Sequence, residues 1–326
     1  MEIISKNKMI LSIIIGIVIF AVLLYFSNIR EIISILSKIN PIWIIFIIMI
    51  YSIGWLLRGY RWKIILRSMD YIIKLKDSIS LVILGNFANL ITPAKIGDFV
   101  RAFVLKRNDN VDISKGISSV VVDRILDFFG VAILAYVSLS MISKDLSLPS
   151  WANILTNNSI YIMISGFIII GMVSKINISE KYLYRINAVG KVYKKFVSPL
   201  FENIKTVYRP IEMTKLCIIS IAIWLFDIST VIILLYSLGY FVNIPLIISA
   251  VMIANMTKVL PLTPGGIGAY EGAFAAIFMV GGLPYTLGLT IGILDHGIKN
   301  LYTIVFGILS LNYNGIRLRE LERKTG

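Results

Sequence analysis

A break in a long apolar stretch constrains the fold of this chain most. The apolar residues 244–260 and 273–280 flank Thr263-Pro264-Gly265-Gly266-Ile267-Gly268-Ala269-Tyr270-Glu271-Gly272, which holds four glycines, a proline and a carboxylate. Proline and glycine interrupt a helix, and lipid cannot satisfy the backbone groups that the break frees. Because the flanking runs are short for separate spans, we expect a re-entrant turn, buried in protein or lining a wet cavity. The alternative is a short loop outside the membrane.

Composition places the chain among all-α integral membrane proteins. Of its 326 residues, 57% are hydrophobic and only 15% are charged, which is typical of a polytopic membrane protein. The single cysteine, Cys217, excludes an internal disulfide, and the single histidine, His296, excludes a histidine-rich metal site. The sequence contains no CxxC, HExxH, Walker or DxD motif, so we expect no metal and no cofactor.

Apolar runs predict six membrane spans and two re-entrant helical hairpins in one membrane domain. The expected spans are residues 9–26, 41–57, 117–142, 159–173, 216–238 and 285–311, and the expected hairpins are residues 79–105 and 244–280. Basic residues gather at the N-terminus, in residues 58–76, 106–115 and 175–215, and in the tail. The positive-inside rule then places both termini and the basic linker 175–215 in the cytoplasm of a cell-membrane protein. This topology accounts for the net charge of +14, so nucleic acid is not an expected partner.

Two parts of the chain, about residues 41–142 and 216–311, resemble each other. The segment Thr92-Pro93-Ala94-Lys95-Ile96-Gly97-Asp98 matches the segment that begins at Thr263 in its Thr, Pro, Ile and Gly. Other landmarks follow in the same order: Trp55 and Trp224, Asn86 and Asn255, Asp123 and Asp295. With the orientation above, the two hairpins enter from opposite faces, so we predict an inverted repeat, which is a transporter architecture.

Polar side chains at membrane depth form the candidate binding site. The substrate-binding candidates are Asn86, Asn89, Thr92, Pro93, Gly97, Asp98, Arg101, Asp123, Arg124, Asp127, Lys258, Thr263, Pro264, Gly265, Gly266, Gly268, Glu271 and Asp295. An ionisable group inside the bilayer costs at least a few kcal/mol. The alternative is that some of these groups form structural ion pairs, such as Asp295 with Lys299 and Arg124 with Asp127.

The glycines after Pro264 suggest a guest for this site. A helix that begins there would present free N–H groups to an anion, and glycine allows a phosphate to approach the backbone closely. A dinucleotide-binding loop is excluded, since Glu271 stands where its third glycine is needed. A second glycine pair, Gly288 and Gly292, has the spacing of a helix–helix contact. We therefore expect a lipid with an anionic head group as the partner.

At these motifs the chain resembles the lysylphosphatidylglycerol synthase transmembrane-region family, also called flippase-like domain proteins. The resemblance covers nearly the whole chain and is carried by Arg58-Gly59-Tyr60-Arg61-Trp62, by Asn86, Asn89, Thr92-Pro93, Gly97-Asp98 and Arg101, by Asp123-Arg124, and by Pro264-Gly265-Gly266-Ile267-Gly268 with Glu271. Asp98 stands where family members often have Glu. The family includes the membrane half of the multiple peptide resistance factor, which moves aminoacylated phosphatidylglycerol between leaflets. The aminoacyl-transfer domain of that protein is not found in this sequence, so lipid aminoacylation is not implied.

Pattern and resemblance together predict a lipid translocase, or flippase, rather than an enzyme. Its substrate would be a phosphorylated lipid or lipid-linked head group, and lipid-modifying or glycosyltransferase proteins are possible partners. One alternative is an enzyme or accessory subunit of polyprenyl- or dolichol-phosphate-linked glycan assembly, with the carboxylates as general acid and base. The other is a membrane scaffold without catalytic function.

Overall fold

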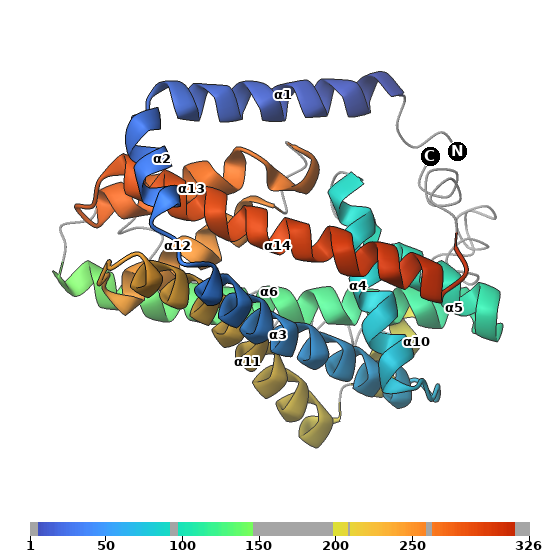
Figure 1. The fold of residues 1–326 in the computed structure, drawn as a ribbon. Coiled ribbons are helices and arrows are strands. Elements are labelled where there is room, and N and C mark those ends of the chain that lie inside the picture. The colour runs from blue at the N-terminus through green and yellow to red at the C-terminus, as the bar shows by residue number, and fades with distance from the viewer. Residues whose placement is uncertain (1–5, 92–96, 146–197, 208, 259–262, 317–326) are drawn as a thin grey trace, which may run out of the picture.

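The computed structural model describes residues 6–91, 97–145, 198–207, 209–258 and 263–316 (Figure 1). Every regular element in these ranges is a helix, which confirms the predicted all-α class for this part of the chain. The expected span 159–173, most of the basic linker 175–215, and the motif residues Thr92 and Pro93 lie outside it.

Three described helices are long and apolar enough to cross a membrane. They are α3 (Pro41–Ser68), α6 (Ile113–Asp145) and α11 (Pro210–Ser237). A fourth span is possible if α1 (Lys6–Tyr25) and α2 (Ile29–Ser37), which meet at 95°, act as one broken span. The expected last span is a continuous helix, α14 (Tyr285–Tyr313), which carries charged residues. The six-span count and the inverted arrangement stay predictions.

Each of the two expected hairpin segments contains one helix before its Thr-Pro motif and one helix after it. In the first, α4 (Leu75–Ile91) precedes the motif and α5 (Val100–Asp109) follows it. In the second, α12 (Ile244–Thr257) is followed by the short 3-10 turn η3 (Pro264–Gly266) and by α13 (Ala269–Val280). The α4 helix contacts η3, and a Cβ placed on Gly265 would lie 3.5 Å from Leu90 Cδ2. The C-terminal end of α4 therefore lies against the turn that follows α12 in the second segment.

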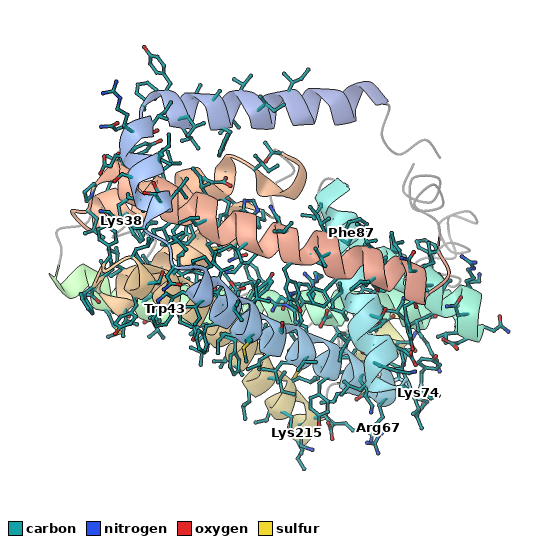
Figure 2. All side chains as sticks on the ribbon, viewed as in Figure 1. Lys38, Trp43, Arg67, Lys74, Phe87 and Lys215 are labelled. Atoms are coloured by element: carbon teal, nitrogen blue, oxygen red, sulfur yellow. The ribbon has the colours of Figure 1, made fainter. Side chains whose placement is uncertain are left out.

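Small residues let the helices pack closely. The α13 and α14 helices lie against each other. A Cβ on Gly288 would lie 2.9 Å from the Cα atom of Ala275, and a Cβ on Gly292 would lie 3.0 Å from the Cα atom of Glu271. The predicted glycine contact is thereby confirmed. Figure 2 shows Phe87 on α4 beside α14, where its ring leaves no room for a side chain at Gly307.

Basic side chains from separate segments gather at one end of the helix bundle. Arg67, Lys74 and Lys215 lie near this end, whereas Lys38 lies near the other end (Figure 2). The positive-inside interpretation requires the first three residues to share one side of the membrane. Their common position supports that requirement, and the assignment of this side to the cytoplasm stays a prediction.

Candidate functional site

A cavity of about 370 Å³ lies where the two halves of the chain meet. Its wall comes from α3, α4, α6, α11, α12 and α14, together with residues just before α5 and the turn before α13. The long helices contribute residues near their midpoints, such as Trp55 of α3, Asp127 of α6 and Trp224 of α11. If these helices cross the bilayer, the cavity lies close to its midplane.

Behind the wall, α3, α5 and α6 are joined by a buried ion network. Arg61 Nη2 lies 2.8 Å from Asp123 Oδ1 and 2.6 Å from Asp127 Oδ1. Arg101 Nη2 lies 2.7 Å from Asp123 Oδ2, and its guanidinium stands 4.9 Å from the centre of the Trp62 ring. Asp123 is thus held by two fully buried arginines. Buried charges need such close partners because water does not screen or solvate them.

Arg124 extends this network to the cavity wall. Its Nη2 lies 2.9 Å from Asp127 Oδ2, and its Nη1 lies 3.5 Å from Asp98 Oδ2. Asp98 is positioned by Asn89, whose Oδ1 accepts the Asp98 backbone N–H at 3.2 Å. The network therefore contains three arginines and three aspartates, so its formal charges cancel. The expected Arg124–Asp127 ion pair is present.

Arg58 stands apart from this balance. Its guanidinium carbon lies 5.3 Å from the ring centres of both Trp55 and Trp224, where the aromatic faces favour a cation. Among the described residues, its buried Nη1 has no hydrogen-bond partner, and no carboxylate forms an ion pair with it. A cation at the cavity wall that forms no ion pair of its own among the described residues is suited to bind an anion.

The turn before α13 depends on glycine. The φ angles of Gly265, Gly266 and Gly268 are 65°, 80° and 84°, in the region that residues with a Cβ rarely adopt. Thr263 Oγ1 is buried at the cavity and has no hydrogen-bond partner among the described residues. Lys258 Nζ lies 3.9 Å from the centre of the Tyr270 ring. Thr263 and Lys258 thus bring two further donors to the cavity wall.

The backbone of this turn differs from our expectation of a helix start open to an anion. The Gly268 N–H donates to Glu271 Oε2 at 2.7 Å, and the Gly266 N–H donates to the Thr263 carbonyl oxygen at 3.2 Å. Glu271 acts here as a cap that satisfies the first donor of α13. These two N–H groups are therefore occupied within the protein, and side-chain donors are the better candidates for holding a phosphate.

A second buried cluster joins α11, α13 and α14. Lys299 Nζ lies 3.1 Å from Asp227 Oδ2 and 2.9 Å from Asp295 Oδ1. Tyr270 Oη donates to Asp295 Oδ2 at 2.6 Å, and Thr230 Oγ1 donates to Asp295 Oδ1 at 3.2 Å. The expected Asp295–Lys299 pair is present, and Asp295 has partners at both carboxylate oxygens.

The predicted site residues divide into three groups. Those that line the cavity are Asn86, Asn89, Asp98, Arg124, Asp127, Lys258, Thr263, Gly265 and Gly266. Those that lie behind its wall are Gly97, Arg101, Asp123, Gly268, Glu271 and Asp295. Thr92 and Pro93 are outside the described residues, and for Pro264 only the backbone is described. The role of each in binding a ligand stays a prediction.

Several side chains at the cavity or in its ion network are not among the binding residues predicted from the sequence. They are Tyr51, Trp55, Arg58, Arg61, Trp224, Asp227 and Lys299. The sequence predicts that Arg58 and Arg61 lie in a basic stretch after a span that ends at residue 57, but α3 continues to Ser68 and buries Arg61 completely. Arg58 follows Trp55 by three positions, so the two share a helix face, and this spacing was the available signal.

Comparison with known proteins agrees with the motifs. Residues 11–307 match the family model described as the lysylphosphatidylglycerol synthase TM region. The chain belongs to this family. Glycosyltransferase AglD of Haloferax volcanii is 30% identical over 86% of this chain and 51% of its own length, so this chain spans about half of that relative. A UPF0104 membrane protein of Methanocaldococcus jannaschii is 25% identical over 100% of this chain and 99% of its own length. A UPF0104 membrane protein of Pyrococcus horikoshii is 26% identical over 93% of this chain and 97% of its own length. No solved structure matches.

Proposed function

We propose that this protein moves a lipid with an anionic head group between the leaflets of a membrane and holds the phosphate in the cavity beside Arg58. The observation that carries the proposal is the position of Arg58, which lies between Trp55 and Trp224 and forms no ion pair among the described residues. A cation that lacks an ion pair inside a membrane domain is costly. A bound phosphate would supply an anion in direct contact with Arg58.

The electrostatics of the remaining cavity wall support an anionic guest. Its three aspartates, Asp98, Asp127 and Asp227, all make ion pairs with Arg124 or Lys299. Their negative charges are therefore offset, and they repel a phosphate less than free carboxylates would. Lys258 and Thr263 add donors on the side of the cavity formed by the second broken segment.

The size and place of the cavity suit a head group. Pockets for small ligands have volumes of about 300–1,000 Å³, and the volume of about 370 Å³ lies at the lower end of that range. Acyl or prenyl chains would then remain in the surrounding lipid. In transporters, a substrate site commonly lies near the midplane, where discontinuous helices meet. The meeting of α4 with η3 places such a break beside the cavity.

The test is a translocation assay in vesicles that contain the purified protein. Fluorescent phosphatidylglycerol serves as the anionic probe, fluorescent phosphatidylcholine as the zwitterionic probe, and a membrane-impermeant quencher reports the outer leaflet. We expect the protein to speed the exchange of the anionic probe, and Arg58→Ala to lose this effect while Arg67→Ala, at an exposed position, retains it. Exchange at the rate of protein-free vesicles, or equal rates for the native protein and Arg58→Ala, would contradict the proposal.

A role in lipid-linked glycan assembly is the second candidate, favoured by the match to glycosyltransferase AglD. The match covers only half of that protein, so transfer activity does not follow from it. Incubation of the purified protein with polyprenyl phosphate and labelled nucleotide sugars separates the two candidates. Labelled lipid product would favour catalysis, whereas translocation without product would favour transport.

A further inference from the structure

We propose that Glu271 and His296 form a proton-binding site that braces the turn of residues 263–268, so that binding of the anionic head group is coupled to uptake of one proton. This inference rests on the proposed function and adds a second ligand, the proton, to the same site.

The two side chains contact the turn at two places, Gly265 and Gly268. His296 Nδ1 lies 2.7 Å from Glu271 Oε1, and His296 Nε2 lies 3.0 Å from the carbonyl oxygen of Gly265. The other carboxylate oxygen of Glu271 accepts the Gly268 N–H at 2.7 Å. Glu271 and His296 are 4% and 2% exposed, so water contributes little to these contacts.

The two hydrogen bonds of His296 require one more proton than an ionised Glu271 and a neutral His296 carry together. The Gly265 carbonyl oxygen can only accept, so Nε2 of His296 must carry a hydrogen. The hydrogen bond at Nδ1 then requires either a second hydrogen on the ring or a protonated Glu271 carboxyl that donates to the ring. Both arrangements contain the same extra proton, shared by the pair.

Loss of that proton breaks the brace. If the remaining ring hydrogen sits on Nδ1, the lone pair of Nε2 faces the Gly265 carbonyl oxygen. If it sits on Nε2, the lone pair of Nδ1 faces the Glu271 carboxylate. A buried contact between two acceptors is unfavourable, so one of the two hydrogen bonds of His296 is lost and the turn is held less firmly. Gly265 and Gly266 line the cavity, and the cavity wall therefore changes with the protonation of the pair.

The charges around the pair set the direction of the coupling. The Tyr270 ring lies 4.6 Å from the His296 ring and carries Lys258 Nζ over its face. On α14, Asp295 precedes His296 and is paired with Lys299, which also pairs with Asp227 of α11. The formal charges of Lys258, Lys299, Asp227 and Asp295 cancel. From α1, an apolar side chain, Ile19, faces Gly268. An anion placed beside Arg58 and Lys258 then adds the negative charge that favours the protonated pair.

Binding of phosphatidylglycerol in nanodiscs, measured from about pH 5 to about pH 8, tests the coupling. The charge of its phosphodiester does not change over this range, whereas histidine titrates within it. Because the head group and the proton favour each other, affinity should fall as pH rises, by up to about tenfold per pH unit for one coupled proton. Calorimetry in buffers of different ionisation enthalpy should show uptake of up to one proton per lipid, and this readout needs no variant.

Glu271→Gln separates a proton site from a merely structural pair. The glutamine amide can donate to Nδ1 of a neutral His296 and still accept the Gly268 N–H, so the brace forms without the extra proton. We expect Glu271→Gln to bind the lipid with little dependence on pH, whereas Glu202→Gln, an exposed carboxylate in α10 (Ser198–Val207), behaves like the native protein. Two outcomes overturn the proton coupling and leave the proposed function intact. One is lipid binding by the native protein without pH dependence or proton uptake, and the other is full pH dependence of binding in Glu271→Gln. Absence of binding at every pH removes the proposed function as well.

Discussion

Arg61 and Asp123 are 62 positions apart in the chain, yet Arg61 Nη2 lies 2.8 Å from Asp123 Oδ1 and both side chains are fully buried. This ion pair joins α3 to α6 behind the cavity. Arg101 binds the other oxygen of the same carboxylate, so a single aspartate joins three helices. The geometry therefore indicates a structural role for Asp123, distinct from the residues that line the cavity.

We expect Asp123→Asn to lower stability strongly, because it leaves Arg61 and Arg101 buried with too little negative charge. Breaking a buried ion pair in this way costs about 3–5 kcal/mol. Unfolding of the purified protein in detergent measures the loss. Asp70→Asn is the matched control, since Asp70 is exposed with a φ of 57° that asparagine also adopts. Equal unfolding of the two variants would show that the network carries little stability.

We expect Arg58→Ala to weaken binding of phosphatidylglycerol by about 10- to 100-fold, the range of a lost hydrogen bond to a charged group. Arg58→Lys should restore part of the affinity, because lysine keeps the charge but lacks the planar fork and stacks less well between Trp55 and Trp224. Binding in nanodiscs measures both, with Arg67→Ala as the control. If Arg58→Lys binds no better than Arg58→Ala, charge at this position does not drive binding.

Two glycines with nearly the same backbone angle separate strain from crowding. Gly266 has a φ of 80°, and a Cβ there would lie 2.7 Å from Lys258 Cγ. Gly239 has a φ of 79° and would meet no atom within 4 Å. Alanine should strain the backbone at either position by about 1–2 kcal/mol, but only Gly266→Ala should displace Lys258 and weaken lipid binding. If Gly266→Ala and Gly239→Ala bind the lipid equally well, the turn that contains Gly266 is not part of the binding site.

The expected orientation predicts which loops are reached from outside the cell. In a Cys217→Ser background, Phe241→Cys, just after α11, should react with an impermeant thiol reagent applied to intact cells. Asn108→Cys, near the end of α5, should react only after the membrane is opened. Both positions are exposed in the structure. The reverse labelling pattern would place the basic segments outside and contradict the predicted topology.

The breaks and the polar groups could be predicted from the sequence because they are local. Proline and glycine at residues 263–268 mark the interruption between α12 and α13, and the Asp295–Lys299 and Arg124–Asp127 pairs follow from helical spacing. Arg61 was missed for a physical reason. Its charge is tolerated at depth only because Asp123 and Asp127 come from a distant helix, and hydropathy along α3 alone cannot reveal those partners.

The same limit explains the omission of Arg58. Its place between Trp55 and Trp224 requires α3 and α11 to lie side by side. The two tryptophans were recognised as matching landmarks of a repeat, but matching positions need not be close in space. The occupied N–H of Gly268 was equally hidden, because its acceptor, Glu271, could also have faced the cavity.

The tryptophans that enclose Arg58 also reveal a directional asymmetry. Arg58 follows Trp55 by three positions, and Asp227 follows Trp224 by the same distance. Asp127 follows Asp123 by four positions, and Lys299 follows Asp295 by the same distance. All four of these second residues line the cavity, and each carries the opposite charge to its counterpart. Each part of the chain thus gives the cavity wall one cation and one anion from these positions, Arg58 with Asp127 and Lys299 with Asp227, and the four charges cancel. The other charged residues of the lining are Arg124, Lys258 and Asp98, so the described wall carries one more cation than anions, an excess that a single anionic group would balance.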